Sequence, residues 1–340
     1  MMKTNKLILL FALPGFMACK KTVILEPDLT TVTEFPMKKE TKVSVIKTDS
    51  IILAPEKIFI LNDQIWVCQR KKDKIFDVFD LLTGRHLYST GTKGQGPNDF
   101  IHPQANTIAV EGDKFTLLDI NVMKTVRITP SGQTETVDAK RTFDLLPVNG
   151  FVKLNDTVFC AFADCATGTV GDYEYRQKNI STENESKFSP YPEFLSDRKF
   201  EDEQRCRIYY KYPVANPHKN KMATFYGFFK FFRIYDYNGV MEKQVFVKIP
   251  PYSSDNVDDW EKREVYYGPP SATEDYIYAP CGAGEIQVWD WQGNPVIQYS
   301  FDRPFYTFAV SEPHKKIFMV SAEEEDLDKI YTADLVHLPS

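Results

Sequence analysis

The sequence predicts an all-β protein, and three observations lead to that prediction. From about residue 43 onward, short runs rich in Val, Ile, Phe, Tyr and Thr alternate with turns rich in Gly, Asn, Asp and Pro, which is typical of successive short strands. Helical periodicity is nearly absent, and only residues 256–265 show it weakly. The third observation is a turn motif that recurs along the chain.

The recurring turn places Asp or Thr at the end of an apolar strand and Gly three or four residues later. It occurs at residues 80–84, 129–132, 236–239 and 290–293. The Asp or Thr side chain can hydrogen-bond the turn backbone, and Gly tolerates the positive φ needed there. Successive glycines lie 48, 107 and 54 residues apart. Because the middle gap is much longer than the others, a degenerate repeat is expected inside it, over residues 151–194.

A period of roughly 50 residues with four short strands is the size of a propeller blade. Residues 43–340 have room for six such blades. The ring must close, because an open edge strand would invite aggregation. Residues 42–46 are therefore expected to join the last blade, beside residues 317–320 and 329–332. The predicted architecture is a six-bladed β-propeller with shared-blade closure over residues 43–340.

The densest aromatic segment of the chain is residues 225–235. Taken as one strand, this segment is apolar on both faces, so both faces must be covered. A strand between two neighbouring blades meets that requirement. We therefore predict a core strand here rather than an exposed aromatic platform.

The chain begins with the features of a secretory signal peptide. Lys3 and Lys6 precede a ten-residue apolar stretch, residues 7–16, and Ala18 directly precedes Cys19. This stretch is too short to cross a bilayer, which needs about 20 residues, so residues 1–18 are predicted to be cleaved. Cys19 resembles the lipidated cysteine of a bacterial lipobox and is the predicted lipid-attachment site. The alternative is a plain secretory signal with Cys19 lost or buried.

The segment after Cys19 is rich in Thr, Lys, Glu and Pro and has little periodicity. We predict that residues 19–42 form a lipidated N-terminus and flexible tether. No later stretch approaches transmembrane length, so the rest of the chain is expected to be soluble. The membrane is therefore a partner only through the lipid anchor.

Composition limits the classes of partner and of metal chemistry. The formal net charge is -6, whereas nucleic-acid binding needs a concentrated basic surface, so no nucleic-acid partner is expected. After Cys19 an odd number of cysteines remains, which cannot all pair. Cys160 and Cys165 are close enough for a local disulfide, and buried free thiols are the alternative. No Cys-x-x-Cys pair is present, which disfavours zinc and thioredoxin-like chemistry.

One glycine-rich motif follows the first predicted blade, over residues 91–100. Gly94 and Gly96 permit unusual backbone angles, Pro97 fixes the exit, and Asp99 precedes Phe100, which can anchor in the next blade. We interpret the motif as structural. A phosphate-binding loop is disfavoured, because the Gly-x-x-x-x-Gly-Lys-Ser/Thr pattern and a following helix are both missing.

Residues 94–100 resemble the Gly-x-Gly-Pro-x-Glu-Phe motif of the TolB-like six-bladed β-propeller lipoproteins of the Bacteroidetes, with Asp99 in place of Glu. Residues 216–223 are similar to a second motif of that group, Asn-Pro-x-x-x-Lys-Met-Ala. The resemblance implies a propeller fold and says little about activity. In such lipoproteins an acidic run after the cysteine directs export to the surface, whereas Lys20 and Lys21 follow Cys19 here. The resemblance thus implies the periplasmic side of the outer membrane, with the cell surface as the alternative.

No catalytic residue, metal site or cofactor is predicted. The five histidines, His86, His102, His218, His314 and His337, lack metal-ligand partners at close spacing. No Gly-x-Ser-x-Gly elbow exists, and no Ser, His and Asp set can be chosen by spacing. We interpret residues 323–326 as a solvated acidic loop, with calcium binding as an alternative, and Asp164, Asp172 and Glu174 as loop carboxylates.

Several aromatic side chains near the C-terminus could stack on a sugar: Trp260, Tyr266, Tyr267, Trp289 and Trp291. Trp289 and Trp291 are two residues apart and are the candidate ligand-stacking pair. Their alternation also suits packing between blades, so both interpretations stay open.

The functional hypothesis is a non-enzymatic binding or scaffold protein. A rigid, monomeric propeller would present one face, with its central funnel, to a protein or glycan at the cell envelope. The alternative is a lyase or hydrolase with an active site built from several blades. Side chains converging on the funnel would favour the enzyme.

Overall fold

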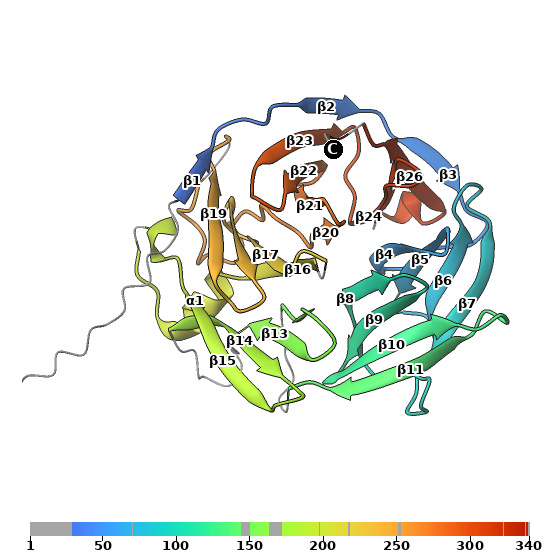
Figure 1. Ribbon diagram of the computed structural model, residues 1–340. Helices are drawn as coiled ribbons and strands as arrows, with labels where there is room; N and C mark the ends of the chain where they lie inside the picture. The colour runs from blue at the N-terminus through green and yellow to red at the C-terminus, as the bar shows by residue number, and fades with distance from the viewer. Residues whose placement is uncertain are drawn as a thin grey trace, which may run out of the picture.

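The computed structural model describes residues 29–69, 71–143, 150–162, 172–196, 198–216, 218–250, 253–321, 323–336 and 338. Six sheets, antiparallel except for one outer strand pairing in each of two of them, are arranged around a central axis, as Figure 1 shows. This arrangement confirms the predicted all-β, six-bladed β-propeller.

The first three blades each contain four consecutive strands, with the first strand innermost. Blade 1 contains β4 (Pro55–Leu61), β5 (Gln64–Gln69), β6 (Lys74–Asp80) and β7 (His86–Thr92). Blade 2 contains β8 (Pro103–Glu111), β9 (Lys114–Asp119), β10 (Val122–Ile128) and β11 (Thr134–Arg141). Blade 3 contains β12 (Val152–Lys153), β13 (Val158–Phe162), β14 (Tyr173–Asn179) and β15 (Asn184–Pro190).

The last three blades each combine consecutive strands with one strand from the N-terminal segment. Blade 4 contains β16 (Lys211–Asn216), β17 (Lys221–Tyr226), β18 (Phe231–Asp236), β19 (Met241–Val247) and β1 (Leu29–Val32). Blade 5 contains β20 (Ser271–Ala272), β21 (Tyr276–Cys281), β22 (Glu285–Asp290), β23 (Pro295–Phe301) and β2 (Lys38–Thr41). Blade 6 contains β24 (Thr307–Ser311), β25 (Lys316–Val320), β26 (Lys329–Asp334) and β3 (Ser44–Lys47).

Blade 6 closes the ring with a strand from the start of the chain. β3 pairs antiparallel with β26, and Ile46 lies opposite Ile330. The backbone N–H of Val43 also donates to the Asp302 carboxylate at 3.0 Å. The predicted shared-blade closure is therefore confirmed, and it leaves β26 without a free edge.

Strands begin nearer the N-terminus than predicted, and the segment that contains them runs along the outer rim of three blades. β1 pairs parallel with β19, and β2 pairs parallel with β23. Figure 1 shows β1, β2 and β3 in blue outside blades 4, 5 and 6; we call residues 29–47 the belt. Two buried side chains hold it, Val32 and Phe35, and the Phe35 ring packs edge-on against Trp289 at 4.8 Å. Residues 29–41 therefore do not belong to the flexible tether expected over residues 19–42, because these anchors and the two strand pairings fix them, and residues 19–28 lie outside the described residues.

The recurring turns join the third and fourth strands of their blades. Their glycines all have positive φ, at Gly84, Gly132, Gly239 and Gly293. Blade 3 contains the degenerate repeat that the spacing predicts. There Asn179 accepts hydrogen bonds from the next turn N–H groups, and Glu183 takes the positive-φ position at 56°. Blade 6 needs no such turn, because β26 and β3 come from opposite ends of the chain.

The core consists of apolar layers between neighbouring blades. The layer between blades 4 and 5, for example, packs Phe225 and Phe232 against Tyr267 and Trp289. The prediction that residues 225–235 are core is confirmed, but their assignment to one strand was wrong. They form the end of β17, a turn and most of β18, because the backbone reverses at residues 227–230.

The loops divide between two faces of the ring. Short hairpin turns occupy most of one face, the hairpin face. The connections between blades lie on the other, the connection face, and the longest of them span residues 191–210 and 248–270. The first holds η1 (Glu193–Leu195) and α1 (Asp202–Ile208), and η2 (Glu324–Asp326) lies in the β25–β26 turn. Residues 256–265 form turns rather than the weak helix suggested by their periodicity. In the described ranges, no helix is long and apolar enough to cross a membrane.

Candidate functional site

The glycine-rich motif forms a compact loop between blades 1 and 2. The Asp99 carboxylate accepts a hydrogen bond from the Gly96 N–H at 3.0 Å and lies directly against Gly94. Phe100 is fully buried and packs edge-on against Phe76, with centroids 5.8 Å apart. The buried Asp119 side chain holds the exit of the loop by accepting from the N–H groups of residues 101 and 102. The loop is therefore held by packing and hydrogen bonds between the two blades, and Pro97 is exposed in its turn.

Substitution of Gly94 tests this packing. A β-carbon there would lie 2.5 Å from Asp99 Oδ2, so Gly94→Ala is expected to lower the free energy of unfolding by about 1–2 kcal/mol. Urea denaturation measures the loss, and the double variant Gly94→Ala/Asp99→Ala should lose less than the sum of the single variants. Gly227→Ala is the control, because its β-carbon would meet its nearest atom at 3.4 Å. Equal losses at both glycines would contradict the argument.

A buried ionic cluster joins blades 3 and 4. Glu174 on β14 has no exposed surface and accepts from the Tyr226 hydroxyl at 2.6 Å and from Arg233 Nη1 at 3.0 Å. It also pairs with the Lys211 ammonium of β16. Arg233 Nη1 donates further to Ser189 Oγ at 3.0 Å and to the backbone carbonyl of residue 190 at 2.7 Å. One carboxylate of blade 3 therefore binds three side chains of blade 4.

Lys211 lies among aromatic rings, with its Nζ 4.9–5.3 Å from the ring centroids of Phe162, Tyr175, Tyr191 and Tyr226. Burial lowers the pKa of Lys211, and Glu174 partly offsets that effect. Both charged groups face only protein atoms. The cluster therefore acts as a clamp between blades, and the interpretation of Glu174 as a loop carboxylate was wrong. Asp172 is exposed as expected, and Asp164 lies outside the described residues.

Two Ser, His and Asp groups come together that spacing alone did not reveal. In blade 1, Ser89 and Asp77 both approach Nε2 of His86, at 3.1 and 3.5 Å. In a catalytic triad, one ring nitrogen of the histidine bonds the serine and the other nitrogen bonds the aspartate. Here both side chains approach the same nitrogen, so the geometry of a triad is missing. At the β24–β25 turn, His314 bonds Ser311 at 2.8 Å, but its other nitrogen lies 3.7 Å from an exposed aspartate. Both groups are turn and strand contacts.

The His, Cys, Asp and Glu side chains that could bind a metal or react as thiols do not form a common site in the described residues. Among the described residues, no three His, Cys, Asp or Glu side chains converge as metal ligands. Cys68, Cys160 and Cys281 are buried and form no disulfide, so the possible Cys160–Cys165 disulfide was wrong. Cys206 is disulfide-bonded. Cys19, Cys165 and His337 lie outside the described residues.

The acidic run in the β25–β26 turn is only partly solvated. Its first three residues are exposed, but Asp326 is buried and accepts from the Tyr331 hydroxyl at 2.5 Å and from Lys329 at 3.0 Å. The buried carboxylate thus supports its own blade rather than a calcium ion.

Lys57 has a pH-dependent effect on stability that can be measured. It lies on β4, the inner strand of blade 1, where the residue is partly exposed, and burial of its ammonium group lowers its pKa to about 8. Between about pH 8 and pH 10.5 the unfolded chain binds more protons at this lysine than the native protein, so stability rises with pH in this window. Lys57→Met should therefore be more stable than wild type at pH 7, by up to about 3 kcal/mol, and the difference should shrink by pH 10.

Urea denaturation at several pH values measures this difference, with Lys187→Met on the exposed strand β15 as the control. A stability difference at Lys57 that stays constant from pH 7 to pH 10 would contradict the assignment.

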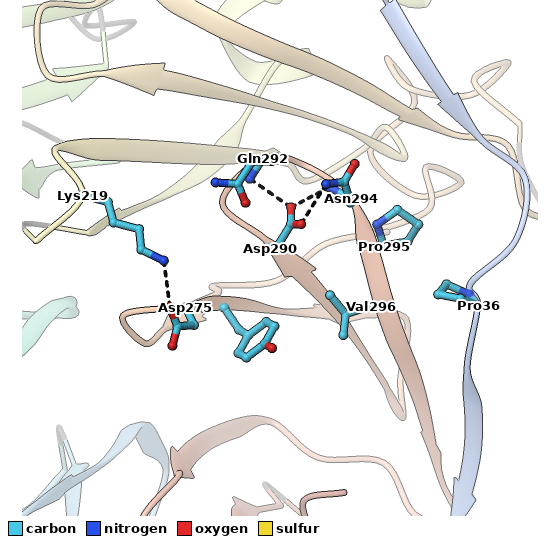
Figure 2. A pocket seen from close by; sticks show the side chains of 9 residues that line it. Pro36, Lys219, Asp275, Asp290, Gln292, Asn294, Pro295 and Val296 are labelled. Atoms are coloured by element: carbon cyan, nitrogen blue, oxygen red, sulfur yellow. Dashed lines mark hydrogen bonds and ion pairs between the residues drawn. The ribbon is translucent and has the colours of Figure 1, made fainter. Parts of the chain in front are cut away.

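A groove of about 420 Å³ lies on the hairpin face between blades 4 and 5. Figure 2 shows Lys219 and Asp275 pointing toward one another at one end, 2.8 Å apart, and Pro36 of the belt at the other. Asp290 accepts from the backbone N–H groups of residues 292 and 294. Most polar groups that line the groove are thus paired with other groups of the protein. The groove therefore offers few unpaired hydrogen-bonding or charged groups to a ligand.

The tryptophan pair proposed for ligand stacking does not face solvent. Trp289 and Trp291 have no exposed surface, and Trp291 donates to the backbone carbonyl of residue 273 at 3.3 Å. The ligand-stacking interpretation of this pair is therefore corrected to packing between blades. Tyr266 and Tyr267 are also buried. Trp260, in contrast, is 78% exposed.

Trp260 belongs to a cluster on the connection face that we call the aromatic–arginine surface. Its members come from three connections, the start of β16 and the β17–β18 turn: Tyr210, Tyr212, Phe228, Trp260, Arg263 and Tyr306. The Arg263 guanidinium lies 3.9 Å from the ring centroids of both Trp260 and Phe228. Tyr210 packs edge-on against Tyr212 at 5.0 Å. Burial, with smaller contributions from Tyr210 and Tyr306, raises the pKa of Tyr212.

Local contacts fix the loop that carries this surface. The N–H of Arg263 donates to the backbone carbonyl of Asp259 at 2.9 Å, so a turn brings Arg263 back beside Trp260. The N–H of Tyr266 donates to the Gly227 carbonyl at 2.7 Å, which ties the loop to the turn that bears Phe228. Arg198 from the neighbouring long connection binds both carboxylate oxygens of Asp258, at 2.8 and 2.9 Å. The surface is thus held on an ordered support.

The ring architecture also appears in comparisons with known proteins. Residues 45–237 match a family described as 6-bladed beta-propeller, DUF5128. No curated protein matches the chain. A crystal structure of a DUF4221 family member from Bacteroides vulgatus is 11% identical, covers 88% of this chain and 97% of its own, and has a TM-score of 0.54.

A crystal structure of a Bacteroides fragilis protein described as exported is also 11% identical. It covers 92% of this chain and 100% of its own, with a TM-score of 0.52. At these identities the likeness is one of fold. The family match spans more than half of the sequence, and this chain therefore belongs to the DUF5128 family of 6-bladed beta-propellers.

Proposed function

We propose that the protein is a non-enzymatic binding propeller of the cell envelope, which holds a protein or glycan partner on its connection face. The observation that carries this proposal is the stack of Trp260, Arg263 and Phe228. Trp, Tyr and Arg dominate the energetics of recognition surfaces, because they combine large apolar area with directed polar groups. Here all three types gather on ordered loops around the start of two inner strands. In the described residues, no observation favours the lyase or hydrolase alternative.

The location in the envelope is part of the same proposal. The signal-like residues 1–18 and Cys19 support export and lipid attachment, as in the TolB-like lipoproteins, and they lie outside the described residues. A Bacteroides fragilis protein of the same fold is described as exported. We propose an outer-membrane lipoprotein facing the periplasm. Cys19→Ser should abolish palmitate labelling and release the protein from membranes, whereas continued labelling would contradict lipid attachment at this cysteine.

Photo-crosslinking of the full-length protein in its own cells tests the binding proposal. A photoreactive residue at position 260 should capture a partner as a covalent adduct of increased mass. The same residue at Val240, which is exposed in a turn of the hairpin face, is the matched control and should capture little. Adducts at position 240 without adducts at position 260 would place recognition on the wrong face and contradict the proposal, and so would no adduct at position 260.

A further inference from the structure

We infer that the ligand of the aromatic–arginine surface is a sugar ring that carries a single carboxylate, such as a terminal uronic acid. This inference rests on the proposed function, since it names the ligand class of the same surface. Three features support it: an unpaired guanidinium, an exposed indole beside it, and the acidity of the surrounding loop.

The guanidinium of Arg263 is positioned by two aromatic rings. Its central carbon lies 3.9 Å from the ring centroids of both Trp260 and Phe228, so the rings stack on the guanidinium and its N–H donors are left for another partner. No hydrogen bond or ion pair of this side chain is found in the parts of the chain that the structure describes. Other arginines, such as Arg127 and Arg198, have carboxylate partners at 2.8 Å. A guanidinium edge matches a carboxylate with two parallel hydrogen bonds, and stacking fixes it in place before binding.

The indole of Trp260 supplies the second contact. One side of the ring meets Arg263, while 78% of the residue is exposed, which leaves indole surface for a ligand. The apolar face of a pyranose ring packs well on such a surface. Tyr306, which interacts with Tyr212 of the same surface, is 60% exposed and has a hydroxyl that can bond a sugar hydroxyl. A carboxylate on the stacked ring would reach the guanidinium beside it.

The net negative charge of the loop favours a ligand that carries few negative charges. Residues 253–268 carry five acidic side chains, Asp255, Asp258, Asp259, Glu261 and Glu264, against Lys262 and Arg263. Such a loop repels ligands with several negative charges, such as nucleotides or sulfated polymers. A single carboxylate can pair with the Arg263 guanidinium and is repelled less by the acidic loop than a ligand with several negative charges.

Calorimetric titration of the full-length protein tests the ligand class. The probes are a glucuronosyl-galactose disaccharide, its carboxyl-reduced counterpart glucosyl-galactose, and a peptide that ends in phenylalanine with a free carboxylate. We expect the glucuronosyl disaccharide to bind roughly 10- to 100-fold more tightly than the reduced one, as for a hydrogen bond to a charged group. Arg263→Gln should remove that preference, whereas Trp260→Ala should weaken both sugars. Arg127→Gln, at an exposed arginine of blade 2, is the matched control and should change neither.

The outcomes separate this inference from the proposed function. Equal binding of the two disaccharides, or binding of the peptide alone, would overturn the sugar-carboxylate class. If adducts at position 260 still form in cells, the binding function would stand without that class. Failure of both the titration and the crosslinking would overturn both. Thermal unfolding of each variant shows whether a lost affinity comes from lost folding, and Trp260→Ala should leave the melting temperature nearly unchanged because the side chain is exposed.

Discussion

Replacement of Glu174 by alanine is expected to lower the free energy of unfolding by about 3–5 kcal/mol, because it leaves Lys211 and Arg233 buried without a counter-charge. Neither cation can reach solvent, since both side chains are buried between blades 3 and 4. The hydroxyl of Tyr226 loses its acceptor as well. Chemical denaturation of the purified variant measures the loss, and differences in expression level are expected to follow it.

The control for Glu174 is a matched ion pair at the surface. Arg127 and Glu135 pair at 2.8 Å with both side chains well exposed, and Glu135→Gln should cost less than about 1 kcal/mol. A second comparison separates the unpaired charges from the lost volume. Replacing Glu174, Lys211 and Arg233 together by uncharged residues of similar size should cost less than Glu174→Ala alone. If Glu174→Ala were no more harmful than Glu135→Gln, the clamp between the blades would be disproved.

Phe35→Ala is expected to destabilise the protein by about 3 kcal/mol, near the lower end for a buried phenylalanine. The lower end applies because the belt can shift away from the cavity and so relieve part of the loss. Phe35 fixes the belt between β1 and β2 by packing on Trp289 and burying itself in the layer between blades 4 and 5. A flexible tether would show no such dependence, so this variant distinguishes the two descriptions of residues 29–41.

Two neighbours in the same segment serve as controls for Phe35. Leu29 and Met37 are apolar but more than a third exposed, so their alanine variants should each cost well under 1 kcal/mol. Hydrogen exchange gives an independent readout. In Phe35→Ala, the amides of β1 and β2 should lose protection while those of blade 1 keep it. Unchanged protection in the belt would show that Phe35 does not anchor it.

The propeller could be predicted from the sequence because its most regular feature, the recurring turn, is formed by residues close together in the chain. The turn with Asp or Thr and Gly is encoded within five residues, and its repeat length sets the number of blades. Even the degenerate turn at Asn179 and Glu183 follows from the gap between the other turns. Closure follows from the need to cover an edge strand.

The belt and the clamp depend on contacts that a local pattern does not contain. Residues 29–41 are polar because these strands add to outer edges, and only Val32 and Phe35 face the core. Glu174 resembles any loop carboxylate until Lys211, Tyr226 and Arg233, which are 37–59 residues away, surround it.

The candidate site was only partly predictable for a similar reason. Trp260 was among the aromatic side chains considered for sugar stacking, but the pair chosen, Trp289 and Trp291, is buried. Alternation along a strand suits both burial and exposure, so it does not decide between them. The spacing of Trp260 and Arg263, three residues apart in a turn-rich loop, was an available signal. The packing of Phe228 on the same guanidinium was not, because that turn meets the loop only in the folded protein.

The belt also links folding to the order in which the chain is synthesised. Residues 29–47 leave the ribosome before any blade is complete, yet their partners are β19, β23 and β26, the last of which ends at residue 334. Contacts between such distant segments form slowly, since the intervening chain must first be brought together. In a chain that stopped short of blade 6, β3 would stay unpaired. The exposed strand edge could then pair with other chains. The ring can therefore close only after blade 6 has been synthesised, because β26 supplies the pairing partner of β3.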